Sequence, residues 1–95
     1  MLFDEVLNLL EEAARELGKE IDVDNVQQAI KDQSRLLAKA IREPGYRRAL
    51  KSARNIVAIA GGIDIVDAAD AADAKLLGVI EGALGMTAKI LGGLI

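Results

Sequence analysis

The sequence contains no cysteine, histidine or tryptophan, and it has one proline, one tyrosine and one phenylalanine among 95 residues. Without cysteine and histidine the chain has no disulfide, no thiolate or imidazole zinc ligand, and neither Ser-His-Asp nor Cys-His chemistry. Aliphatic hydroxyls are also scarce, being confined to Ser34, Ser52 and Thr87. We therefore expect a protein that is not an enzyme and that has no catalytic, metal or cofactor site.

Aromatic residues make up 2% of the chain, whereas apolar residues as a whole make up 52%. A core built from this sequence must therefore come from aliphatic packing, and 95 residues provide one such core at most. We expect a single domain over residues 1–95, in which residues 1–60 form charged amphipathic helices and residues 61–95 form a Gly/Ala-rich assembly helix.

Apolar residues recur at helical spacing in four segments, which predicts an all-α protein. The first segment runs from about Leu2 to Leu17 and stops at Gly18, and Asp22 or Asp24 is placed to cap the second. The apolar side of the first segment comprises Leu2, Phe3, Val6, Leu7, Leu9, Leu10, Ala13, Ala14 and Leu17.

The second segment continues to Ile41, and the third is predicted to begin at Pro44, because proline fits the first turn of a helix. Gly61-Gly62 then breaks the pattern, and Asp64 is a predicted cap for a long last helix that reaches about Leu91. The expected architecture is three amphipathic helices plus a long Gly/Ala-rich C-terminal helix, in a helical bundle or hairpin that assembles into an oligomer.

The last helix has two unlike sides. A broad apolar half contains Leu76, Ile80, Leu84 and Leu91, and the other half collects small residues. Each glycine inside a helix costs about 1 kcal/mol relative to alanine, so glycines gathered on one side suggest the close approach of another helix. The predicted oligomer interface comprises Ala71, Ala74, Gly78, Gly82, Gly85, Leu76, Ile80, Leu84 and Leu91.

Charge is segregated along the chain, although the net charge is only −3. Residues 1–24 carry −6, residues 31–54 carry +6 and residues 55–95 carry −3. Pairing between the acidic and basic blocks, within one chain or between copies, is one interpretation, and an anionic partner is the other. The predicted anion-binding residues are Arg42, Arg47, Arg48, Lys51 and Arg54.

Two acidic patterns invite a metal site and are better explained as helix caps. The carboxylates of Asp64, Asp67, Asp70 and Asp73 follow at steps of three, so they fan around a helix instead of converging on one ion. Asp22 and Asp24 begin like a calcium loop, but the later ligand positions are absent. We expect no metal at either place.

The sequence favours a structural, self-associating protein that forms a ring, tube, filament or particle, such as a component of a phage virion. Membrane association through amphipathic helices is one alternative, and nucleic-acid binding by the basic 31–54 region is another, less favoured because only Tyr46 could stack on a base. The acidic start, Met-Leu-Phe-Asp-Glu, does not resemble a signal peptide, so we expect a location in the cytoplasm or a virion, with peripheral membrane contact as an alternative.

Overall fold

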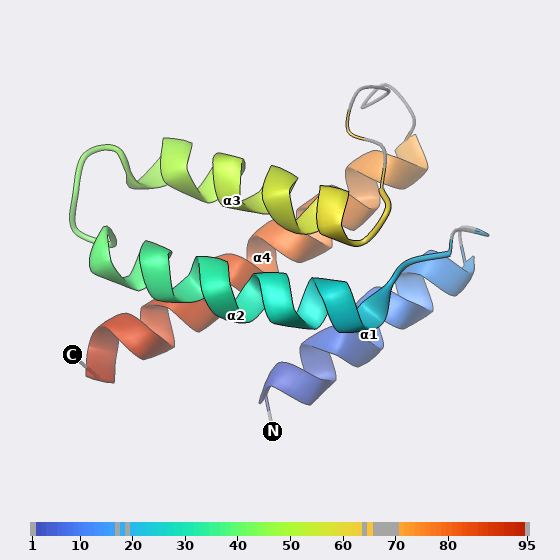
Figure 1. Cartoon of the computed structure of the whole chain (residues 1–95), viewed down its shortest axis with the longest axis horizontal. Coiled ribbons are helices and arrows are strands. Elements are labelled where there is room, and N and C mark those ends of the chain that lie inside the picture. The colour runs from blue at the N-terminus through green and yellow to red at the C-terminus, as the bar shows by residue number, and fades with distance from the viewer. Residues whose placement is uncertain (1, 17, 19, 64, 66–70, 95) are drawn as a thin grey trace.

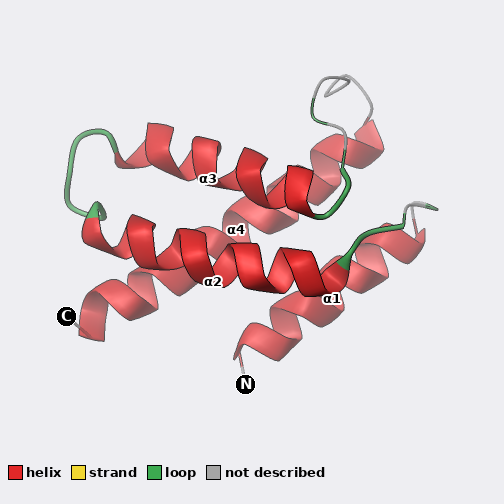
Figure 2. Ribbon diagram, viewed as in Figure 1, coloured by secondary structure: helices red, strands yellow, loops and turns green. Residues whose placement is uncertain are grey.

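A computed structural model describes residues 2–16, 18, 20–63, 65 and 71–94 of the chain. These residues form four α-helices, α1 (Leu2–Glu16), α2 (Val23–Lys39), α3 (Tyr46–Ala60) and α4 (Ala71–Leu94), packed as a compact bundle (Figure 1). Helices and the turns between them account for the whole described chain (Figure 2). The prediction of an all-α helical bundle is confirmed.

The first two helices end and begin at the predicted residues. Gly18 has a φ of +69°, a conformation that residues with a Cβ rarely adopt, and its N–H donates to the carbonyl of Arg15 at 3.2 Å. The Asp22 carboxylate accepts from the backbone N–H of Asn25 at 3.1 Å and caps α2. The backbone N–H of Asp22 also donates to the carbonyl of Gly61 at 3.0 Å, which fixes the start of α2 to the end of α3.

The connection between α2 and α3 is longer than predicted. α2 ends at Lys39 instead of Ile41, and α3 begins at Tyr46, with Gly45 at its N-cap position and Pro44 in the turn before it. The expected start at Pro44 is wrong, because the chain needs the residues from Ala40 to Gly45 to reverse its direction. No side chain caps α3, and its first turn contains no acidic residue.

A glycine pair ends α3, as the sequence predicts. Gly62 has a φ of +83°, and the backbone N–H of Ile63 reaches back to the carbonyl of Ala58 at 2.9 Å. This pattern is the Schellman arrangement, in which a left-handed glycine allows the chain to satisfy the last carbonyls of a helix. The predicted cap Asp64 lies outside the described residues, and the described part of the last helix begins at Ala71.

Helix α4 contacts each of the other three helices and crosses behind α2 and α3 (Figure 1). Its 24 residues correspond to a length of about 36 Å. The last turns remain against α2, because a Cβ at Gly92 would stand 3.4 Å from the Ile41 side chain and 3.6 Å from the carbonyl of Ala38. Gly92 is therefore the glycine of α4 that serves close packing within the chain.

The core is aliphatic, as the composition requires. Its largest completely buried apolar side chains come from all four helices, and they are Leu10, Val26, Ile30, Val57, Leu76, Ile80 and Leu84. Ser34 is the buried polar residue of the described chain, and its hydroxyl has no hydrogen-bond partner there. The molecule is a slab of 39 × 28 × 17 Å.

Candidate functional site

The apolar side of α4 belongs to the core of the single chain. Leu76, Ile80 and Leu84 have no exposed surface, because the other three helices cover them. This corrects their assignment to an interface between copies, which assumed that one chain is too small to bury that side of the helix. Leu91 is partly buried, and it also lies on the core side of α4.

The small residues of α4 lie on the opposite, outward side. Ala74, Gly78 and Gly82 are exposed, and Gly85 is partly buried. No other part of the chain lies within 4 Å of where a Cβ of Gly78, Gly82 or Gly85 would stand. The side chain of the remaining predicted interface residue, Ala71, lies outside the described ones.

A shallow apolar groove of about 250 Å³ runs between α1 and α4 along this small-residue side. Leu9 of α1 and Met86 of α4 line it together with Gly78 and Gly82, and their side chains are 59% and 47% exposed. Leu9 was expected on the buried side of its helix, which is wrong. We call the surface made by Leu9, Ala74, Gly78, Gly82 and Met86 the α1–α4 face.

Charged residues border the α1–α4 face on both helices. Glu5, Glu12 and Glu16 are exposed and share the outward strip of α1 with Leu9, since they lie three, four or seven positions from it. Lys75 and Lys89 are exposed on the glycine side of α4. Lys75 pairs with Glu16 at 3.7 Å, an exposed contact that contributes little to stability.

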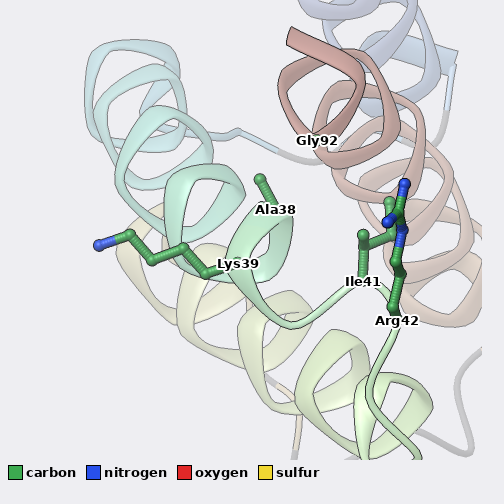
Figure 3. Close-up of a pocket in the computed structure, with 5 residues that line it drawn as sticks. All are labelled: Ala38, Lys39, Ile41, Arg42 and Gly92. Atoms are coloured by element: carbon green, nitrogen blue, oxygen red, sulfur yellow. The ribbon is translucent and has the colours of Figure 1, made fainter. Parts of the chain in front are cut away.

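Four of the five predicted anion-binding residues are exposed around the α2–α3 connection. Arg47, Arg48 and Lys51 line a hollow of about 550 Å³ together with Pro44 and Gly45, at the start of α3. Arg42 lines a second hollow, of about 380 Å³, between the C-terminal ends of α2 and α4. In this second hollow, Arg42 lies along α4 while Lys39 extends outward (Figure 3).

The fifth predicted residue, Arg54, is separated from this group. Its guanidinium bonds to the Asn55 side chain at 3.1 Å and lies 3.9 Å from the Glu81 carboxylate of α4. Arg54 is partly buried there, which makes it a link between α3 and α4.

Sequence analysis missed two basic residues, Lys39 and Lys89, because they lie 50 positions apart. Lys89 lines a hollow that shares Ile41, Arg42 and Gly92 with the one beside Lys39. We call the surface made by Lys39, Arg42, Arg47, Arg48, Lys51 and Lys89 the basic end. In Figure 1 the α2–α3 connection and the C-terminus of the chain lie on the same side of the bundle.

The described residues contain no group of three or more Asp and Glu side chains arranged to hold a metal ion. Of the aspartate series, Asp64, Asp67 and Asp70 lie outside the described residues, as does the side chain of Asp73. One stretch of α4, Ala74–Gly93, is long and apolar enough to cross a membrane. A helix at the centre of a bundle has the same properties, and the buried side of α4 is of that kind.

No protein-family model, curated protein or solved structure matches this chain. Function must therefore be inferred from its own surfaces.

Proposed function

We propose that the protein is a non-enzymatic structural protein that assembles with copies of itself through the α1–α4 face. The observation that carries this proposal is the exposed row of Ala74, Gly78 and Gly82 beside the exposed Leu9. The row lies on the outer side of a helix whose inner side is fully packed.

The glycines of this row have no role in the packing of one chain. Alanine at Gly78 and at Gly82 would have room, and each replacement would favour the helix by about 0.5–1 kcal/mol. The present sequence therefore gives up helix stability at both positions. A helix whose outer face bears only hydrogen atoms lets a neighbouring side chain or helix come close, which would offset that cost.

The partner favoured by the spacing of these residues is a second copy. In one chain α1 and α4 run antiparallel, because Glu16 near the end of α1 meets Lys75 near the start of α4. Leu9 lies seven residues from Glu16, and Gly82 lies seven residues from Lys75, so both are about 10 Å along their helices from this ion pair. Leu9 and Gly82 are therefore at the same height.

A twofold rotation about an axis parallel to the two helices keeps these heights and exchanges the two strips. It places Leu9 of each copy over the open space at Gly82 of the other, and an isologous contact of this kind satisfies both copies at once. The same rotation brings the acidic strip of α1, with Glu5 and Glu12, against the α4 side that carries Lys89. Lys89 makes no ion pair with any described residue.

The size of the surface fits this role. The broad side of the slab measures 39 × 28 Å, and stable interfaces bury about 800 Å² on each partner. Membrane crossing by α4 is less favoured, because its apolar side is already covered by the bundle and its outer side carries Lys75 and Lys89.

Replacing Gly82 with leucine tests the proposal. The new side chain meets nothing within 4 Å in the single chain, so we expect the helical content and the free energy of unfolding of the monomer to be retained. In the assembly it occupies the space assigned to Leu9 of the neighbour, so we expect the mass in sedimentation equilibrium to fall to 10.1 kDa.

The matched control is Gln28→Leu, which adds the same exposed side chain on α2, away from the α1–α4 face. This variant should keep the mass of the unmodified protein. Equal masses for Gly82→Leu and the unmodified assembly would exclude the α1–α4 face as the contact.

A further inference from the structure

We propose that the basic end binds the phosphate backbone of nucleic acid without reading its sequence. Six exposed basic side chains gather there, and Glu43 is the acidic residue of the α2–α3 connection. None of Lys39, Arg42, Arg47, Arg48, Lys51 and Lys89 makes an ion pair with another described residue. This proposal is independent of self-association, because the residues of the basic end and those of the α1–α4 face are different.

The arrangement of the basic end suits phosphate groups. Its side chains line hollows, one at the start of α3 and an adjoining pair between the ends of α2 and α4. A hollow lined by Arg47, Arg48 and Lys51 surrounds an anion from several directions, and guanidinium groups match phosphate oxygens in pairs. The backbone at the start of α3 adds positive potential, with no acidic residue in the first turn to cancel it.

Nucleic acid fits these hollows better than a membrane surface does. Large exposed apolar side chains are absent from the described residues that line them, where Ile41 is partly buried and the other apolar residues are alanine, proline and glycine. A peripheral membrane site relies on such side chains to enter the lipid. A chain of phosphates needs only several separated cationic positions, which the hollows provide.

The lone described aromatic residue gives no base contact. Tyr46 packs against the core and its hydroxyl is buried, so it is not available to stack on a base. Binding should therefore depend on charge and be insensitive to sequence.

The test uses a fluorescent duplex of about 20 base pairs and measures affinity by anisotropy as salt rises from about 50 to about 200 mM. Six phosphate contacts predict a slope of about −5 for log affinity against log salt, which is a loss of about a thousandfold over this range. The double variant Arg47→Gln/Arg48→Gln should bind more weakly at every salt concentration, and its slope should be smaller by about 2, giving a loss of about a hundredfold.

The control double variant, Arg15→Gln/Arg35→Gln, removes the same charge from exposed positions of α1 and α2 outside the hollows. It should keep the slope and stay within about threefold of the original affinity. Circular dichroism melting checks that both variants fold. Two competitors distinguish other anionic partners, namely phosphatidylserine vesicles and polyglutamate.

The proposal is supported if unlabelled duplexes of unrelated sequence displace the probe and the two competitors, at equal charge, displace it poorly. It is overturned if the duplex does not bind at the lowest salt, if both double variants lose affinity equally, or if either competitor displaces the probe as well as the duplex does. A self-association defect, as in Gly82→Leu, would leave the hollows intact, so the two proposals fail separately.

Discussion

Replacing Ile80 with aspartate is expected to unfold the bundle. Ile80 has no exposed surface and lies in the middle of α4, where the other three helices meet. The substitution removes the packing of a large side chain, which costs about 2–5 kcal/mol, and it buries a carboxylate without a partner, which costs about 3–5 kcal/mol more. A domain of this length is stable by about 5–14 kcal/mol in total, so most of that stability is lost.

Circular dichroism and urea denaturation measure this effect directly. The matched control is Gly82→Asp, two residues further along the same helix at an exposed position with open space. This second variant should retain its helical signal and show cooperative unfolding. If the two aspartate variants have similar unfolding midpoints, the assignment of the inner and outer sides of α4 is incorrect.

Replacing Gly61 with alanine is the second substitution with a large expected effect. A Cβ at this position would stand 2.5 Å from Cγ2 of Val26, which is completely buried and cannot move aside. The carbonyl of Gly61 also accepts the hydrogen bond from Asp22 that fixes the start of α2. We expect the free energy of unfolding to fall by about 1–3 kcal/mol, the usual cost of overpacking a core.

Two comparisons separate this steric effect from a change in backbone freedom. Gly45→Ala adds a methyl group in open space and should change stability by less than about 0.5 kcal/mol. Combining Gly61→Ala with Val26→Ala removes the opposing methyl group, so the double variant should be more stable than the sum of the two single effects predicts. Simple additivity in denaturant melts would show that the clash is not the cause.

Local signals in the sequence predicted the helices well. Gly18 and Gly62 occupy the left-handed conformations that end α1 and α3, and Asp22 caps α2 through its own side chain. These features depend on a few neighbouring residues, which is why they can be read without a structure. Pro44 was misplaced by two residues, because the length of a helix connection depends on how the two helices pack.

The surfaces were harder to predict, because they depend on contacts between distant segments. The periodicity of α4 separated an apolar side from a glycine side, but it could not show that α1, α2 and α3 cover the apolar side within one chain. Leu9 lies only about 100° around α1 from the buried Leu10, so its exposure depends on where α4 lies. Lys89 joins Lys39 at the basic end only because the ends of α2 and α4 meet.

The mass of the unmodified protein in solution tests the central claim most directly. Sedimentation equilibrium over a wide range of protein concentrations should show a species at twice 10.1 kDa or at a higher multiple, growing in proportion as the concentration rises. A single species of 10.1 kDa at every concentration, with α4 folded and its glycines facing water, would contradict the proposed assembly.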